Sequence, residues 1–304
     1  MGTPTPTPTP TEAPNRRSQW LGVGALVLTA VLWSWNGPLV KLLNENGAGV
    51  PAVTIAFYRS FLGGLLIAPW TIRPWRTRLE APFRLRIAAV VAFALMSITF
   101  IVTASLTTAA SAIVLQYTSP VWVVALSPVL LGERASKGEA SILLIAMAGI
   151  AVIFLGAPMD ARLAVLVGIS SGFTYALVQL TVRGLRRVHP ATVACVNALG
   201  SALLLLPGVV LWGSFALTPR QFGLMLVMGI VPFAFPYVLF AYGLRHVAAY
   251  RAALIVLLEI VLTPLWTYLV VGEIPPPSTV VGGALILSSV AAWVLFTWAR
   301  SRRA

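Results

Sequence analysis

Long apolar stretches alternate with short polar or basic segments between residues 20 and 299 of the chain. A helix needs about 20 predominantly apolar residues to cross the hydrocarbon core of a bilayer. Ten stretches approach that length, so we expect an all-α integral membrane protein with ten transmembrane helices. The expected helices are residues 20–43, 51–72, 85–106, 110–131, 139–158, 162–183, 191–213, 221–244, 250–271 and 279–299.

One kind of segment occurs twice in this pattern. Residues 109–133 contain the fourth expected helix and end at Gly132-Glu133, whereas residues 248–273 contain the ninth and end at Gly272-Glu273. Each repeat therefore holds five helices. An odd number makes the second repeat enter the membrane upside down, and carriers built in this way hold their substrate at the seam between the repeats.

The two five-helix repeats are expected at residues 19–158 and 159–300, between two short tails. Residues 1–18 form a Thr/Pro-rich N-terminal tail. Proline at alternate positions prevents a helix, so we expect this tail to be extended and disordered. Residues 301–304 form a basic C-terminal tail.

Charged residues are few in the chain, and most of them are basic. Charged residues make up 10% of the sequence and hydrophobic residues 59%, whereas a soluble domain carries about 25% charged residues. The net charge of +13 would suit a nucleic-acid-binding protein, but the basic residues stand in short clusters between apolar stretches. Such clusters mark cytoplasmic helix ends. With the N-terminus inside, all but four of the 21 Lys and Arg residues fall on the cytoplasmic side. We therefore expect a multi-pass protein in the lipid bilayer, with both termini cytoplasmic and no nucleic-acid partner.

Several short motifs lie along the chain in a characteristic order. They are Trp33-Ser34-Trp35-Asn36-Gly37 with Lys41, Phe57-Tyr58-Arg59, residues 109–133, residues 175–183 and residues 248–273. Together they resemble the drug/metabolite transporter superfamily in its ten-helix EamA-type form. The chain departs from that pattern at Glu259-Ile260, where the family usually reads Glu-Pro, and at Tyr175, where it often has tryptophan.

The resemblance implies a secondary transporter in a bacterial-type inner membrane that exports amino acids or other small metabolites. Aromatic and other neutral amino acids suit a pocket rich in rings. Alternating access around a central cavity between the repeats is the expected mechanism. Efflux of drugs, nucleobases or sugars is the alternative, together with an anion or nucleotide-sugar exchanger of the same superfamily. The sequence leaves the substrate, the direction, proton coupling and the choice between a monomer and a homodimer open.

Polar side chains at membrane depth mark candidate sites because they need a partner there. Glu259 is the acid in the middle of an expected helix, and it would bind a substrate ammonium, take up protons or hydrogen-bond to neighbouring helices. For Arg59 we favour a structural ion pair or carbonyl contacts over binding of a substrate carboxylate, with Glu259 as one candidate partner of the ion pair. Lys41 is expected to be an interfacial anchor.

The candidate substrate-binding residues are mid-depth polar or aromatic side chains: Trp33, Asn36, Ser97, Thr99, Gln116, Tyr117, Tyr175, Gln179, Tyr237 and Glu259. For Ser97 and Thr99, interhelical hydrogen bonding is the competing interpretation. Proline frees a carbonyl and permits bending, so the gating candidates are the mid-helix prolines Pro38, Pro120, Pro232, Pro236 and Pro264.

Catalytic chemistry finds little support in the chain. The two histidines, His189 and His246, are far apart, and the single cysteine, Cys195, makes no internal disulfide and no zinc cage. We expect no enzyme activity, no metal and no cofactor. A nucleotide-binding Gly-x-x-x-x-Gly-Lys loop is also missing. A site for phosphorylated substrates would need two or three basic groups at mid-depth, where the sequence places Arg59 alone.

Overall fold

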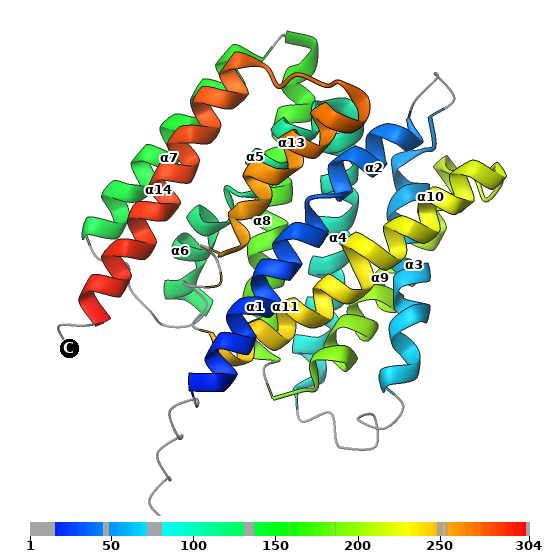
Figure 1. Cartoon of the computed structure of the whole chain (residues 1–304), viewed down its shortest axis with the longest axis horizontal. Helices are drawn as coiled ribbons and strands as arrows, with labels where there is room; N and C mark the ends of the chain where they lie inside the picture. Colours follow the sequence, from blue (N-terminus) through cyan, green and yellow to red (C-terminus); the bar gives the residue numbers. More distant parts are fainter. Residues whose placement is uncertain are drawn as a thin grey trace, which may run out of the picture.

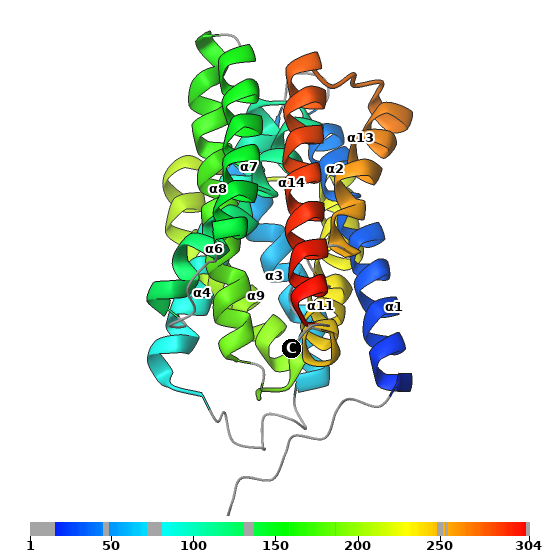
Figure 2. The same cartoon turned by 90° about the vertical axis from the view of Figure 1, so that its left-hand side faces the viewer.

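The computed structural model describes residues 16–44, 49–71, 81–130, 137–157, 159–185, 187–247, 252 and 255–301. Within these ranges the regular secondary structure is helical, and no strand occurs. The helices lie side by side as one bundle (Figures 1 and 2). The prediction of an all-α membrane fold is therefore confirmed.

The first repeat contains two broken helices. Its elements are α1 (Arg16–Trp33), α2 (Asn36–Leu43), α3 (Ala52–Thr71), α4 (Phe83–Leu106), α5 (Ala109–Gln116), α6 (Ser119–Leu130) and α7 (Lys137–Gly156). The first expected helix is thus divided into α1 and α2, and the fourth into α5 and α6. The sequence pattern gave a single helix in both places.

The second repeat begins with a 3-10 turn at Met159–Ala161. Its elements are α8 (Arg162–Gly184), α9 (Pro190–Trp212), α10 (Pro219–Gly229), a π-helix (Ile230–Ala234), α11 (Phe235–His246), α13 (Leu258–Val271) and α14 (Pro277–Ser301). Each of the ten expected segments is helical over most of its described residues, with turns at residues 34–35, 117–118 and 257.

Length and composition single out six of the described helices as able to cross a membrane. They are Ser18–Leu43, Ala52–Thr71, Phe83–Leu106, Arg162–Gly184, Pro190–Trp212 and Pro219–His246. Shorter apolar helical stretches lie at Met147–Gly156, Leu258–Val271 and Pro277–Ser289. The chain is therefore a multi-pass membrane protein.

The two repeats run in opposite directions, as the odd helix count predicts. The amide of Ala109, at the start of α5, donates to Glu273 Oε1 just beyond the end of α13, at 2.7 Å. The fourth and ninth expected helices correspond to each other, so the start of one lies beside the end of the other. Figure 1 shows α6 continuing to the lower end of the bundle while α13 finishes at the upper end. Gly132-Glu133 lies outside the described residues.

Two of the helix breaks follow directly from proline. Pro38 has no N–H to donate to the carbonyl of Ser34 four residues earlier, and the chain turns at residues 34–35. Pro120 likewise leaves the carbonyl of Gln116 without its helical donor, and the chain turns at residues 117–118.

The prolines of the second repeat act differently from one another. Pro232 lies within the π-helix and Pro236 at the start of α11, so the eighth expected helix is distorted where they stand. Pro264 lies inside a continuous α13. The expectation that Pro264 interrupts its helix is wrong, because membrane helices tolerate proline where neighbouring groups satisfy the freed carbonyl. The turn before α13 falls at Leu257 instead.

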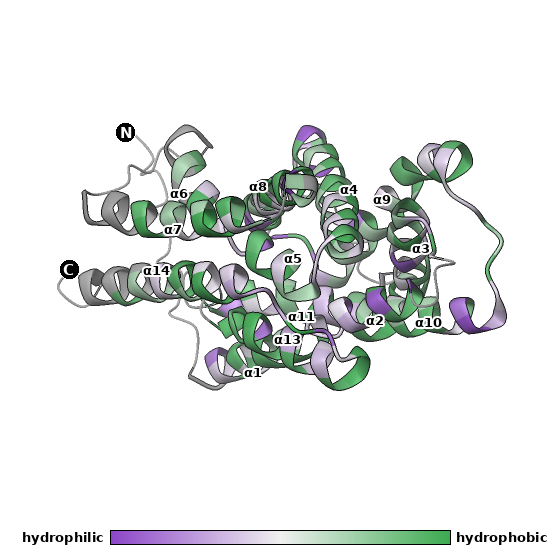
Figure 3. Cartoon of the chain, turned by 90° about the horizontal axis from the view of Figure 1, so that it is seen from above, coloured by the Kyte–Doolittle hydropathy of each residue, from purple (hydrophilic) through white to green (hydrophobic). Residues whose placement is uncertain are grey.

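Helix α5 lies at the centre of the bundle. All eight of its residues are buried, and the view from above shows it surrounded by the other helices (Figure 3). Close packing against α8 depends on Gly172. A Cβ added at this glycine would lie 2.0 Å from Thr118 Oγ1 and 2.8 Å from the carbonyl oxygen of Leu115. This contact holds the second repeat against the broken fourth helix of the first.

We predict that Gly172→Ala destabilises the protein by about 1–3 kcal/mol, because the added methyl forces α8 away from backbone that cannot move freely. Gly24→Ala is the matched control, since nothing lies within 4 Å of a Cβ at that position of α1. The measurement is the thermal unfolding midpoint of each purified variant in detergent. Equal midpoints for the two variants would contradict the packing role of Gly172.

Candidate functional site

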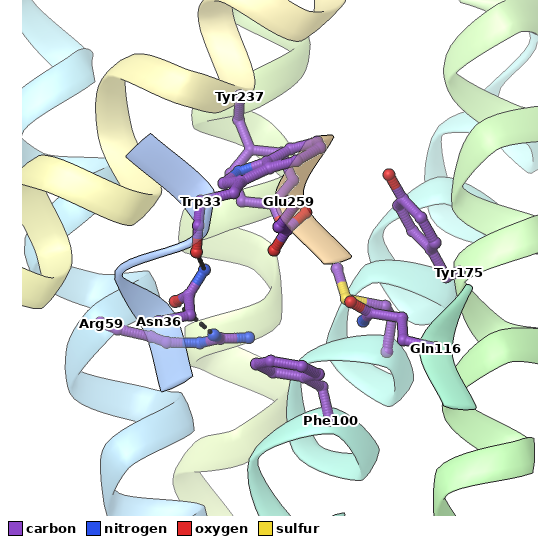
Figure 4. A pocket seen from close by; sticks show the side chains of 9 residues that line it. Trp33, Asn36, Arg59, Phe100, Gln116, Tyr175, Tyr237 and Glu259 are labelled. Atoms are coloured by element: carbon purple, nitrogen blue, oxygen red, sulfur yellow. Dashed lines mark hydrogen bonds between the residues drawn. The ribbon is translucent and has the colours of Figure 1, made fainter. Parts of the chain in front are cut away.

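A small cavity lies at the seam between the repeats (Figure 4). Side chains from both repeats line it: Trp33, Asn36, Arg59, Met96, Phe100 and Gln116 from the first, and Tyr175, Tyr237 and Glu259 from the second. The volume open to the centre of a water molecule is about 20 Å³. Since a cavity needs roughly 10–15 Å³ on this measure to hold one water, the cavity has room for one or two waters.

Helix breaks place most of the polar lining. Trp33 ends α1 and Asn36 begins α2, while Gln116 ends α5. Glu259 is the second residue of α13, and Tyr237 follows the π-helix closely. Irregular backbone at membrane depth is tolerated where protein or a water-filled cavity surrounds it. The breaks in helices of both repeats therefore meet at one level and build the site there.

Arg59 is almost completely buried, with 2% of its surface exposed. Its Nε and Nη2 donate to Ser97 Oγ at 3.2 and 2.7 Å, Nη2 also donates to the Ser97 carbonyl at 3.4 Å, and Nη1 donates to Asn36 Oδ1 at 3.4 Å. The rings of Phe233 and Phe100 lie 5.4 and 5.9 Å from the guanidinium carbon. Of the structural alternatives for Arg59, the structure therefore shows a carbonyl contact.

No ion pair joins Arg59 to Glu259 in the part of the chain that the structure describes, where the one pair within 4.0 Å is Lys41–Glu273. Both side chains nevertheless line the same cavity. The guanidinium is held by neutral groups and ring faces alone.

Glu259 is 4% exposed and hydrogen-bonds to the first repeat. The hydroxyl of Tyr117 donates to Glu259 Oε2 at 2.8 Å and to the carbonyl of Val256 at 2.7 Å. Backbone at the turn before α13 is rearranged, since the amide of Ile260 donates to Leu257 three residues earlier. Tyr117 thereby fixes both the turn and the carboxyl group.

Aromatic rings form one wall of the cavity. The ring centroid of Trp33 lies 6.4 Å from that of Tyr175, 5.1 Å from that of Tyr237 and 4.9 Å from that of Phe240. The buried indole nitrogen of Trp33 has no hydrogen-bond partner among the described residues. The wall therefore offers ring faces and a spare N–H donor.

The other candidate residues lie around the cavity or away from it. Gln116 lines it and donates to Ser171 Oγ at 3.3 Å. Gln179 lies off the lining and donates to Ser119 Oγ at 3.0 Å. Ser97 and Tyr117 stand behind the lining as partners of Arg59 and Glu259.

Thr99 also lies off the cavity lining. Its hydroxyl donates to the Leu95 carbonyl at 2.7 Å and lies 3.3 Å from Thr174 Oγ1, which is an interhelical contact. Met96 and Phe100, on the same helix, do line the cavity, and sequence reasoning missed them. They are apolar residues in an apolar helix, and their four-residue spacing, which puts them on one face, was the available signal.

A polar cluster joins the repeats where α2, α5 and α13 meet, toward the upper end of the bundle in Figure 1. Lys41 Nζ lies 2.9 Å from Glu273 Oε2 and also donates to the carbonyl of Thr107, while Glu273 Oε1 accepts from the amide of Ala109. Gly272 ends α13 with φ of 70°, a left-handed conformation that suits glycine. The turn brings the Glu273 carboxylate to the positive N-terminus of α5. Lys41 is thus an interhelical partner, and its expected role as an interfacial anchor stays a prediction.

Three further contacts join the repeats near this end. The rings of Trp35 and Trp266 stack with centroids 5.5 Å apart, and Trp266 Nε1 donates to Ser34 Oγ at 3.0 Å. Ser111 Oγ of α5 lies 2.7 Å from Thr279 Oγ1 of α14. Each of these contacts crosses from one repeat to the other.

The sequence profile of the EamA-like transporter family matches residues 20–155 and, a second time, residues 161–295. The chain belongs to this family. The resemblance stated from the motifs is therefore confirmed, and the chain is a transporter of the drug/metabolite transporter superfamily.

Relatives of this EamA-like transporter carry transporter names. An uncharacterized transporter of Archaeoglobus fulgidus is 33% identical over 273 residues, covering 88% of this chain and 94% of the relative. The pseudopaline exporter CntI of Pseudomonas aeruginosa is 27% identical over 266 residues, covering 86% and 93%. A solved crystal structure with 19% identity covers 93% of this chain and 98% of its own, with a TM-score of 0.66. That likeness shows the fold.

We predict that Tyr117→Phe lowers the stability of the protein by about 0.6–2 kcal/mol, the range for hydrogen bonds between membrane helices. Loss of the hydroxyl removes the shared donor of Val256 and Glu259. Tyr175→Phe is the matched control, because its hydroxyl makes no hydrogen bond to another residue that the structure describes. Thermal unfolding of both variants in detergent tests this, and an equal change in both would contradict the role of the Tyr117 hydroxyl.

Proposed function

We propose that this EamA-like transporter exports neutral amino acids, aromatic ones in particular, by alternating access. The observation that carries the proposal is the composition of the cavity. It combines a carboxyl group, a guanidinium, two amides and an aromatic wall, and both repeats contribute to it. A free amino acid presents a carboxylate, an ammonium and a side chain to such a lining. The export direction is supported by the relative that is named an exporter.

The small volume of the cavity supports alternating access. Sites for drug-sized ligands measure about 300–1,000 Å³, whereas this cavity has room for one or two waters. A substrate can enter only after helices separate. Broken helices at Trp33, Gln116 and Leu257 supply bending points beside the cavity. The Lys41–Glu273 cluster must separate for the upper end to open.

The distribution of basic residues supports an orientation in a bacterial-type inner membrane. The start of α1 and the end of α14 lie at the lower end of the bundle (Figure 1). Basic residues at the start of α4 and at the ends of α8 and α11 fall at that end too, among them Arg84, Arg183 and Arg245. We place this end, with both termini, in the cytoplasm. The Lys41–Glu273 cluster then closes the outer end.

The alternative substrates use the cavity less completely. Sugars and nucleobases have no pair of charged groups that would bind the buried carboxyl group and the buried guanidinium together. Nucleotide sugars and other phosphorylated anions favour several basic groups, and among the described lining residues Arg59 is the basic one. Neutral amino acids therefore remain the substrate class that fits best.

Purified protein in proteoliposomes should exchange radiolabelled L-phenylalanine faster than protein-free vesicles. Trp33→Ala should slow L-phenylalanine exchange about 2- to 10-fold more than L-alanine exchange, because ring packing contributes about 0.5–1.5 kcal/mol beyond burial. Equal losses for the two amino acids would reject the aromatic wall. Flux of nucleobases or sugars without any amino-acid flux would reject the substrate class.

We predict that Glu273→Gln opens the outer end more often. A reporter cysteine at buried Thr267 of α13, in a Cys195→Ala background, should react with an external water-soluble maleimide about fivefold faster, as expected for loss of roughly 1 kcal/mol. Lys41→Arg keeps the charge and serves as the control. An unchanged labelling rate in Glu273→Gln would show that the ion pair does not hold the closed end.

A further inference from the structure

Arg59 has hydrogen-bonding capacity that the protein leaves unused. Its Nη1 carries two hydrogens, and the contact found for this nitrogen is the long one to Asn36 Oδ1 at 3.4 Å. Its Nε and Nη2 are directed to a single residue, Ser97. A buried cation costs free energy unless it is paired, and no carboxylate lies within 4.0 Å of this guanidinium among the described residues.

The carboxyl group of Glu259 likewise has unused hydrogen-bond acceptors. This group accepts from the hydroxyl of Tyr117. That hydroxyl has a single hydrogen, which Glu259 and the Val256 carbonyl share. A carboxylate accepts several hydrogen bonds through its two oxygens. Most of its accepting capacity is therefore free, and no cation lies within 4.0 Å of it in the described part of the chain.

Both unfilled groups face one space. Figure 4 shows the guanidinium end of Arg59 and the carboxyl group of Glu259 turned toward the same space, with Gln116 reaching in from another side. Arg59 comes from α3 of the first repeat and Glu259 from α13 of the second. A basic and an acidic side chain thus stand on opposite sides of the seam, and they are not paired with each other.

We propose that Arg59 and Glu259 form the two ends of a zwitterion site. Arg59 binds the α-carboxylate of the substrate, and Glu259, held by the Tyr117 hydroxyl behind it, binds the α-ammonium. This assignment rests on the proposed amino-acid transport and makes Arg59 a substrate-binding residue, beyond the structural role expected from the sequence.

The charges of such a complex balance. A zwitterion supplies one negative and one positive group, so binding neutralises both buried side chains and leaves the net charge of the cavity unchanged. An amine without a carboxylate leaves Arg59 unpaired, and an acid without an ammonium leaves Glu259 unpaired. Buried charges that lose one partner are strongly destabilised. The site therefore selects for substrates that carry both groups at short separation.

A structural role alone would give a different result. If Arg59 only held Ser97 and α4 in place, its replacement would weaken every ligand by the same factor. A ligand-contacting role instead predicts that the replacement abolishes the preference for one functional group. This difference in pattern can be measured.

The experiment is displacement of radiolabelled L-phenylalanine from the purified full-length protein in detergent, where membrane permeation of the competitors plays no part. The competitors are L-phenylalanine, phenethylamine, which lacks the carboxylate, and 3-phenylpropionate, which lacks the ammonium. Wild-type protein should bind L-phenylalanine about 10- to 100-fold more tightly than either analogue, as expected for a charged group left without its buried partner.

Charge-removing variants should then lose one preference each. Arg59→Gln should bind L-phenylalanine and phenethylamine with similar affinity and still discriminate against 3-phenylpropionate. Glu259→Gln should show the mirror pattern. Arg59→Lys should keep part of the carboxylate preference. Thermal unfolding confirms that each variant is folded, and the wild-type comparison of analogues needs no variant at all.

Two failures are distinguishable. If wild-type protein binds L-phenylalanine and both analogues equally well, the zwitterion site is wrong while amino-acid transport stands. Uniform weakening of all ligands by Arg59→Gln leads to the same conclusion. If wild-type protein binds no amino acid, the proposed function fails, and the zwitterion site fails with it.

Discussion

A polar group at membrane depth must find its partner in the protein or in a bound solute, because lipid offers none. This constraint organises the molecule. The Val256 carbonyl beside a helix break is satisfied by the Tyr117 hydroxyl, and the Glu273 carboxylate by the start of α5 and by Lys41. Arg59 and Glu259 have hydrogen-bond partners, but neither finds a counter-charge in the described residues. Where the protein leaves such groups unfilled beside a cavity, a substrate supplies the missing partner.

The inverted repeat explains why these groups converge. Corresponding helices run in opposite directions, so breaks in both repeats reach the same depth from opposite sides. The start of α5 then lies against the end of α13, and a Gly-Glu pair that follows a helix in one repeat can cap a helix of the other. The motif Gly272-Glu273 thus has a physical role: glycine turns the chain, and the carboxylate joins three segments. Its counterpart at Gly132-Glu133 falls outside the described residues.

The fold follows from the sequence far more completely than the site does. The ten apolar segments, and their division into two repeats of five, follow from hydropathy and charge. Lipid requires apolar side chains along the whole length of a membrane-spanning helix, so the pattern is easy to find in the sequence. The breaks after Trp33 and Gln116 carried a local signal in Pro38 and Pro120, yet Pro264 left its helix intact. Met96 and Phe100 carry no polar signal; their spacing puts them on one helix face, but packing decides that this face lines the cavity. The Lys41–Glu273 pair joins residues far apart in the chain, and no local pattern specifies such a contact. Arg59 could be placed at mid-depth but not beside Glu259.

The most direct test of this account measures the two ends of the bundle in one protein. Spin labels placed in a Cys195→Ala background report the distance between α2 and α13 at the end closed by Lys41 and Glu273, and between α4 and α11 at the opposite end. The account predicts that L-phenylalanine shifts the two distance distributions in opposite directions, one end opening as the other closes. Distances that stay fixed at both ends, or that lengthen together, would contradict a carrier that alternates around a site between inverted repeats.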